Sequence, residues 1–396
     1  MPTRALSVKL RVETVEEVDP DRNGLENESL YLKPRRRRRC VVLPVLITVD
    51  TEYNFAAWRD GSAASLAENA ALSIDCRARD GSLWGVGHQM DLLDRYGQRG
   101  VFFVDPMAAL VWGPRAVDHV VHPILARGHD VQLHCHSEWL DAAPRNPITA
   151  RRGSNMHDFP LADQIALLQW GIERLVESGA PRPVAFRAGN YGANDDTLRA
   201  LAAVGLRYDS SVTPGFADSA CSIDGRAGDI RPVERHGVVE LPVAAMGSSR
   251  DGLRHVQLTA ISGREMRAAI RHAARASWPA FTLVSHSFEL FHRQRRLGNR
   301  IVERRFESLC AFLANDPSAN SATFKDLAGP WAPPLTTTTD AELALPRISR
   351  RREWERLGEQ AIVRFGESDW RPALSGRVMS AMALAGVMVV GDAMAF

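Results

Sequence analysis

The chain has 396 residues, of which 45% are hydrophobic and 24% are charged, and its formal net charge is +2. These values are ordinary for a soluble globular protein with a large core, built either as one domain with tails or as two domains. A net charge so close to zero gives no global case for binding nucleic acid or a membrane surface, and neither is expected as a partner.

The five cysteines are scattered along the chain and contain no CxxC pair. Their odd number and irregular spacing favour reduced thiols over a disulfide framework. The first residues are mixed and charged, without the apolar core of a secretory signal, and no apolar stretch is long enough to span a bilayer. A cytoplasmic location is therefore expected.

Composition predicts three segments. Residues 1–40 lack sustained periodicity and end in an arginine block, Arg35 to Arg39, so we expect a disordered or basic extension. The block is interpreted as a solvated charge run, with a nucleic-acid or anionic-lipid patch as the alternative. Residues 41–329 carry the patterns of a folded domain. Residues 330–396 indicate a linker and tail, with a terminal helix as one interpretation of the apolar run at 378–390.

The first predicted strand runs from Val41 to Val49. Its continuous apolar character is typical of a parallel strand that is covered on both faces. Pro44 has no amide donor, so regular pairing is expected to start at Val45. The strand leads into Asp50 and Glu52, whose spacing of two residues places both carboxylates on one face if the chain stays extended.

Strands and helices then alternate along the chain. Helices are expected at Val86–Tyr96, Arg115–Ala126, Leu161–Glu177, Asn194–Val204, Arg264–Arg275 and Ile301–Leu313. Strands are expected at Val101–Val104, Val131–Leu133, Val184–Phe186, Leu206–Tyr208, Val238–Leu241, Phe281–Val284 and Ala322–Phe324. This alternation predicts an α/β fold with right-handed parallel crossovers. Asn54–Ser82 and Asp141–Pro160 are predicted to be long segments that partly cover a site.

Three of the apolar strands end in ionisable side chains. These groups are Asp50 and Glu52 after the first strand, His134, His136 and Glu138 after the third, and His286 after the strand at 281–284. Imidazoles and carboxylates are costly to bury without partners. Because parallel strands present their carboxyl ends at one edge of a sheet, this convergence predicts a shared metal or catalytic site.

Four motifs resemble those of the polysaccharide deacetylase family, also known as NodB-homology or carbohydrate esterase family 4 proteins. In chain order they are Thr48-Val49-Asp50-Thr51, Gly128 to His134, Phe186 to Gly192, and Leu283 to His286. The resemblance covers about Val41 to Leu327. It implies a distorted (β/α) barrel and a divalent metal, usually zinc. It also implies hydrolysis of a carbon–nitrogen amide bond, with removal of the acetyl group from an N-acetylated sugar or polysaccharide.

The same resemblance implies roles for individual residues. Asp50 corresponds to the base that removes a proton from water, and Arg187 would orient it. His134 corresponds to the first metal ligand, and His286 to the acid that protonates the leaving amine. The backbone amide of Tyr191 would help to stabilise the oxyanion.

The metal motif departs from the family pattern at two positions. Thr51 stands where the family has a second aspartate, and Glu52 follows it directly. Glu138 stands where the family has its second metal histidine, and His136 is another candidate. The expected ligand set is therefore His134, with Glu138 or His136, and with Asp50 or Glu52. Hydrolysis of another linear amide, or glycan binding by a catalytically degenerate domain, are the alternative functions.

Overall fold

The computed structural model describes residues 42–143, 146–224, 232–248 and 252–327, together with residues 352, 354 and 356–359. The chain divides into residues Met1–Cys40 and Val41–Phe396, and every described residue belongs to the second unit. The expectations for residues 1–40, the arginine block and the apolar run at 378–390 lie outside the described residues.

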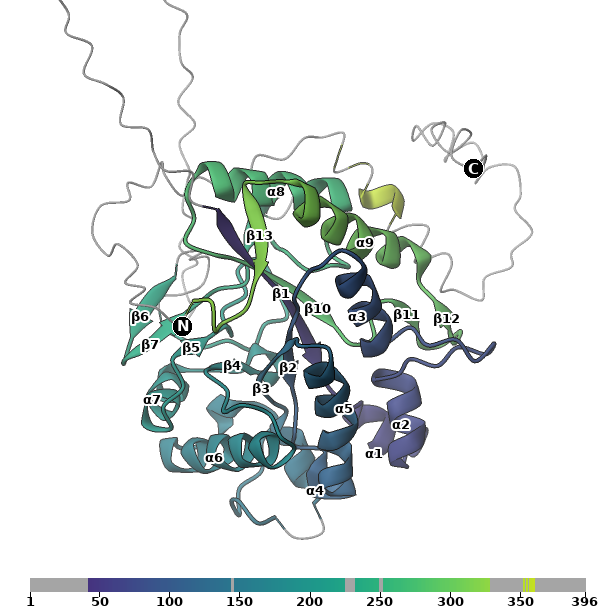
Figure 1. The fold of residues 1–396 in the computed structure, drawn as a ribbon. Coiled ribbons are helices and arrows are strands. Elements are labelled where there is room, and N and C mark those ends of the chain that lie inside the picture. The colour runs from purple at the N-terminus through teal and green to yellow at the C-terminus, as the bar shows by residue number, and fades with distance from the viewer. Residues whose placement is uncertain are drawn as a thin grey trace, which may run out of the picture. The chain divides into compact units, whose positions relative to one another are not determined.

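A nine-stranded sheet forms the centre of this unit (Figure 1), in the order β10-β1-β2-β3-β4-β5-β7-β6, with β13 also paired to β1. Its strands are β1 (Leu43–Thr51), β2 (Val101–Val104), β3 (Asp130–Cys135), β4 (Ala185–Ala188), β5 (Tyr208–Asp209), β6 (Val233–Arg235), β7 (Val238–Glu240), β10 (Phe281–His286) and β13 (Ala319–Ala322). All pairings are parallel except that between β6 and β7. β1 pairs with β10 from Val45 onward, but its pairing with β13 already begins at Leu43, two residues earlier than Pro44 led us to expect.

Helices surround the sheet and provide its crossovers (Figure 1). They are α1 (Phe55–Arg59), α2 (Leu66–Ser73), α3 (Val86–Arg95), α4 (Ala109–Trp112), α5 (Pro114–Ala126), α6 (Leu161–Glu177), α7 (Asp195–Ala203), α8 (Gly263–Arg275) and α9 (Arg300–Asn315). The prediction for α6 is confirmed at both ends. Asn194 caps α7, because its side chain accepts the amide hydrogen of Thr197.

The structure differs from the sequence-based prediction in its short strands. The predicted set lacks β6 and two small hairpins, β8 (Ala245–Ser248) with β9 (Gly252–His255) and β11 (Phe291–His292) with β12 (Leu297–Gly298). These strands have two to four residues each. Such lengths are too short for an alternating apolar pattern to be recognised. The last strand also lies earlier than predicted, at Ala319–Ala322 rather than 322–324.

The sheet curls into a distorted barrel, which confirms the predicted fold class. The free edge of β10 is covered by the segment around Val256 to Leu258 rather than by a regular strand. The Val284 amide donates to the Val256 carbonyl at 3.1 Å, and the Leu258 amide donates to the Val284 carbonyl at 3.0 Å. This irregular pairing closes the β10 side without a complete ladder, which is why the barrel is distorted rather than cylindrical.

Side chains alternate between the inside and the outside of this barrel. In β1, Val45, Ile47 and Val49 belong to the large core between sheet and helices, whereas Leu46 belongs to a separate core inside the barrel. Asp50 lies four residues after Leu46, so its side chain points to the same side of β1. The side chains that point into the barrel therefore change from apolar to ionisable toward the carboxyl ends of the strands.

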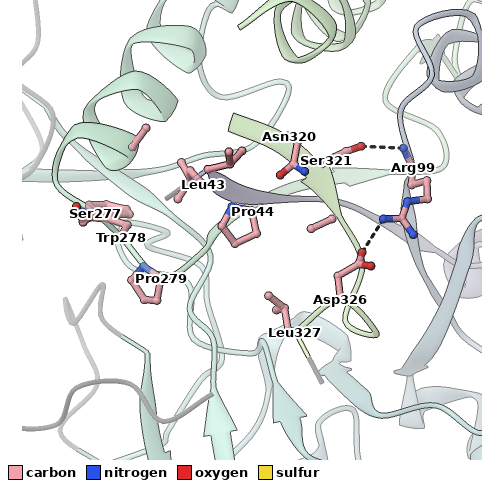
Figure 2. Close-up of a pocket in the computed structure, with 13 residues that line it drawn as sticks. Leu43, Pro44, Arg99, Ser277, Trp278, Pro279, Asn320, Ser321, Asp326 and Leu327 are labelled. Atoms are coloured by element: carbon pink, nitrogen blue, oxygen red, sulfur yellow. Dashed lines mark hydrogen bonds and ion pairs between the residues drawn. The ribbon is translucent and has the colours of Figure 1, made fainter. Parts of the chain in front are cut away.

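The opposite end of the barrel is closed by apolar side chains. Phe324 packs against Phe103 and Tyr208 inside it. A cavity of about 620 Å³ lies at this end, beside Leu43 and Pro44 at the start of β1 (Figure 2). Side chains packed at the amino ends of barrel strands stabilise the fold, whereas active sites lie at the carboxyl ends.

Two further findings concern membrane segments and thiols. None of the helices in the described part of the chain combines the length and the apolar character needed to cross a bilayer. Cys76, Cys135, Cys221 and Cys310 are free thiols. Cys135 is buried in the large core between the sheet and the helices.

Candidate active site

The carboxyl ends of four strands bring the predicted site residues to one mouth of the barrel. Asp50 of β1 is level with His286 of β10, and His134 of β3 is level with Arg187 of β4. In each of the four strands, this residue is at a position whose side chain points into the barrel. The side-chain alternation therefore places all four in the same interior, and the parallel register brings His286 beside Asp50 and Arg187 beside His134.

Glu52, His134 and His136 form a group whose ligand atoms all lie within 4.8 Å of one another. The Glu52 Oε2 atom is 3.2 Å from the His134 Nε2 atom and 2.5 Å from the His136 Nε2 atom. Side-chain exposure is 18% for Glu52 and 13% for His136, against 3% for His134. The group is thus recessed but open to solvent on the side of Glu52 and His136.

Both imidazoles are oriented by their other ring nitrogen. The His134 Nδ1 atom lies 2.7 Å from the carbonyl oxygen of Arg187, so it must donate there. The His136 Nδ1 atom lies 2.8 Å from the Oε1 atom of Glu138. Each Nε2 atom then faces Glu52. Two imidazole nitrogens and one carboxylate are a donor set that catalytic zinc sites use, and such outer hydrogen bonds are typical of metal-bound histidines.

Glu138 therefore lies behind His136 rather than beside His134. It follows β3 in the 3-10 helix η1 (Ser137–Asp141), and its Oε1 atom contacts the Nδ1 atom of His136 rather than the Nε2 atom that faces Glu52. His136, just before η1, is extended and keeps its side chain at the group. Of the two candidates for the second histidine position, the geometry groups His136 with Glu52 and His134.

Charge couples the members of this group. Burial opposes a charge on His136, but the carboxylates of Glu52 and Glu138 raise the pKa of His136 well above its usual value. Burial likewise opposes a charge on Glu52, yet His136 and His134 hold the pKa of that carboxyl well below its usual range. Without a metal ion, the Glu52 carboxylate is thus paired with a protonated His136. A divalent cation bound there would take the place of that proton.

Asp50 and Arg187 form a buried ion pair beneath the mouth. The Arg187 Nη1 atom donates to the Asp50 Oδ1 atom at 2.6 Å and to the Thr48 hydroxyl at 2.9 Å. Its other nitrogens bind the backbone and side chain of Ser210. The guanidinium also lies over the Phe103 ring, 4.4 Å from its centroid. These contacts fix the Asp50 carboxylate and leave its Oδ2 atom directed toward His286, 4.0 Å from that residue's Nε2.

His286 is oriented by Glu289, a residue that the sequence analysis did not assign. The His286 Nδ1 atom donates to the Glu289 Oε1 atom at 2.8 Å, and Gln257 also donates to this carboxylate. Burial lowers the pKa of His286, but Glu289 and, more weakly, Asp50 and Glu52 outweigh it and raise the pKa to about 9. At neutral pH His286 is therefore protonated, with its Nε2 hydrogen directed toward Asp50 and the mouth.

We expect proton NMR titration of the metal-free protein to show His286 losing its proton near pH 9. In Glu289→Gln the pKa should fall by about 1 to 3 units, because an adjacent carboxylate contributes a shift of that size. A folded-state pKa above the ordinary His value of about 6.5 also stabilises the fold below that pH, and the contribution disappears as the pH rises through 9. His122→Ala, on the exposed side of α5, is a control that should leave the pKa of His286 unchanged. An unchanged His286 pKa in Glu289→Gln would contradict the assignment.

Tyr191 lies at the mouth in the 3-10 helix η3 (Gly189–Tyr191). Asn190 and Tyr191 have φ values of 53° and 58°, a left-handed conformation that non-glycine residues rarely adopt in succession. The Tyr191 ring is buried edge-on against Phe216. Burial, and to a smaller extent the charge of Asp50, raise the pKa of its hydroxyl. The ring is thus a packing element, and the role of the backbone amide stays a prediction.

Gly189 allows the close approach of the His136 ring. A Cβ atom at this position would lie 2.7 Å from the Cys135 carbonyl oxygen and 2.9 Å from the ring atoms of His136. Gly189→Ala should therefore displace the imidazole, lower zinc affinity and destabilise the fold by about 1 to 3 kcal/mol. Gly87→Ala is the matched control. Its Cβ atom meets nothing within 4 Å on helix α3, and it should stabilise the fold by about 1 kcal/mol. Metal titration and denaturant unfolding of both variants measure these effects.

Asp105 is a second site residue that the sequence analysis did not assign. It directly follows β2, and its Oδ1 atom accepts the amide hydrogens of Met107 and His136. Its buried Oδ2 atom has no hydrogen-bond partner among the described residues. Burial raises the pKa of Asp105 to about 6, opposed by the charges of His136 and His134. The sequence could have indicated Asp105, because an ionisable residue directly follows an apolar strand there, as Asp50 does in the first strand.

Comparison with known proteins gives structural similarity only. No protein-family model matches the chain, and no curated protein matches it. The chain is similar to the crystal structure of a polysaccharide deacetylase from Mycobacterium smegmatis, with a TM-score of 0.46 and 21% identity over 72% of this chain and 89% of that one. It is also similar to a family 4 carbohydrate esterase from Streptomyces lividans (TM-score 0.34, 12% identity, 72% and 95% covered). A 4-alpha-glucanotransferase from Thermococcus litoralis is similar as well (TM-score 0.44, 11% identity, 74% and 41% covered). At such identities the likeness concerns the fold and does not transfer an activity.

Proposed function

We propose that the chain is a divalent-metal-dependent hydrolase of a carbon–nitrogen amide bond that is not a peptide bond, with an N-acetylated sugar or polysaccharide as its substrate class. One observation supports this most directly. The group formed by Glu52, His134 and His136 shares a barrel mouth with a carboxylate, Asp50, and a protonated imidazole, His286. Amide hydrolysis needs these two opposite proton-transfer groups next to an electrophilic centre.

Glu52, His134 and His136 would hold the cation, for which zinc is our expectation. A divalent cation bound there polarises an acyl carbonyl and makes water a stronger acid. Three protein donors leave a coordination position open, which is the arrangement of catalytic rather than structural sites. Glu138 and the Arg187 carbonyl hold the two imidazoles in the tautomer that presents Nε2.

The chain's own residues would handle the protons. Asp50, fixed by Arg187, accepts the proton of the attacking water through its Oδ2 atom. His286 donates its Nε2 proton to the leaving nitrogen, so that an amine rather than an amide anion departs. Glu289 keeps His286 protonated at neutral pH. The Tyr191 amide is proposed to donate to the developing oxyanion.

Metal removal and restoration test this proposal. The purified protein, stripped with a chelator, should not release acetate from oligomers of N-acetylglucosamine, and added zinc should restore the release. Acetate and free amine should appear in equal amounts, as hydrolysis of the amide requires. Zinc binding without any acetate release would instead favour the alternatives of another linear amide or a glycan-binding domain.

A further inference from the structure

A cavity of about 690 Å³ adjoins His286, and Glu52, His134 and His136 are not among its lining residues. Its wall is built by Gln257 and Glu289, by the β11–β12 hairpin, and by the first turns of α9, including Arg305. His286 belongs both to this wall and to the proposed proton path. The cavity is therefore placed where the portion of a substrate attached to the leaving nitrogen would extend.

An aromatic side chain, Phe288, and a cationic one, Arg293, line the cavity next to His286. The Phe288 ring is stacked on the His286 ring, with centroids 5.3 Å apart and planes 29° from parallel. The Arg293 guanidinium lies over the Phe288 ring, 4.2 Å from its centroid. Arg293 is exposed, and no carboxylate among the described residues forms an ion pair with it. A guanidinium that lies over an aromatic ring can still donate hydrogen bonds to a ligand through its N–H groups.

The negative groups near the cavity are already paired. Glu289 accepts hydrogen bonds from His286 and Gln257, so its charge is balanced within the wall. Glu359 pairs with the buried guanidinium of Arg305, which also donates to the carbonyls of Leu258 and Thr259. Because Glu289 also balances the charge of His286, the Arg293 guanidinium remains as a positive group that can act on a ligand.

We propose that this cavity binds an anionic substituent, a carboxylate or a phosphate, on the amine side of the substrate. The inference rests on the proposed function, because it places the sugar of the N-acyl substrate in the cavity. It goes further in assigning a substrate class, namely acidic rather than neutral N-acylated sugars. Arg293 is the specificity residue, since a guanidinium binds both anions through paired charge-assisted hydrogen bonds.

Calorimetric binding to the metal-free protein tests this assignment without hydrolysis. The probes are N-acetylglucosamine, its 6-phosphate and N-acetylmuramic acid, which add no anion, a phosphate and a carboxylate respectively. At least one acidic sugar should bind about 10-fold more tightly than the neutral one, the effect of a charge-assisted hydrogen bond at a partly exposed position. Arg293→Gln should remove this preference and leave the affinity for N-acetylglucosamine unchanged, whereas Arg293→Lys should retain part of it.

Arg296→Gln is the matched control, because it removes an exposed arginine from the same hairpin outside the cavity wall. Its preference for acidic sugars should equal that of the parent. Equal affinity of the parent for neutral and acidic sugars, or no measurable binding of either acidic sugar, would overturn the inference. So would an unchanged preference in Arg293→Gln. Preferred binding of acidic sugars without acetate release after zinc addition would instead refute the hydrolase proposal and leave the anion site standing.

Discussion

Replacement of His134 by alanine should lower zinc affinity by about 100-fold or more and remove any zinc-dependent hydrolysis. Loss of a residue that only orients a ligand already costs about 10- to 100-fold, so loss of the ligand itself should reach at least the upper end. His134 is the most enclosed member of its group, with 3% of its side chain exposed, and water cannot readily replace it. Zinc titration against a chromophoric chelator measures the change.

Two further variants separate the roles of His136 and Glu138. His136→Ala should lose affinity to the same degree as His134→Ala, because its Nε2 atom faces the same Glu52 carboxylate. Glu138→Ala should lose only about 10- to 100-fold, since Glu138 holds the far nitrogen of His136. His122→Ala provides a histidine deletion outside the site and should bind zinc as the parent does. If Glu138→Ala is the most damaging change while His136→Ala binds normally, Glu138 is the ligand and the grouping is wrong.

Replacement of Asp50 by asparagine should reduce the rate of hydrolysis by about 100- to 10,000-fold, the usual contribution of a general base. The amide keeps the shape of the carboxylate but accepts a proton poorly. Zinc affinity should stay close to that of the parent, because Glu52 rather than Asp50 belongs to the metal group. Parent-like hydrolysis in Asp50→Asn would show that another group removes the proton.

The same substitution should destabilise the fold. The Arg187 guanidinium is fully buried and pairs with Asp50, so neutralising the carboxylate leaves a buried charge without its counterion. Breaking such a pair costs about 3 to 5 kcal/mol. Denaturant unfolding of Asp50→Asn, Arg187→Met and the double variant forms a thermodynamic cycle. The double variant should lose less stability than the two single losses combined, and simple additivity would show that the ion pair does not couple the residues.

Much of the barrel and part of its mouth could be predicted from the sequence. Side-chain direction in a strand repeats every two residues, so Asp50 shares a face with Leu46, and Cys135 faces the outer core between His134 and His136. Parallel strands bring their carboxyl ends to one edge, which is why His286, far along the chain, could be placed beside Asp50 before any contact was known. Helix α6 was predicted residue by residue because its periodicity and stop signals are local.

The hairpins β8–β9 and β11–β12 depended on the tertiary structure, because strands of two to four residues form only where neighbouring segments supply partners. The orientation of the side chains that follow the strand ends also depended on the tertiary structure. Nothing in the spacing of His136 and Glu138 tells which side chain turns toward Glu52, and the tight turn of η1 and the absence of a Cβ atom at Gly189 decide it. Glu289 orients His286 through a bend after β10 that no periodic pattern encodes. Residue types and strand parity are properties of the chain alone, whereas the direction of a side chain in a turn follows from what packs against it.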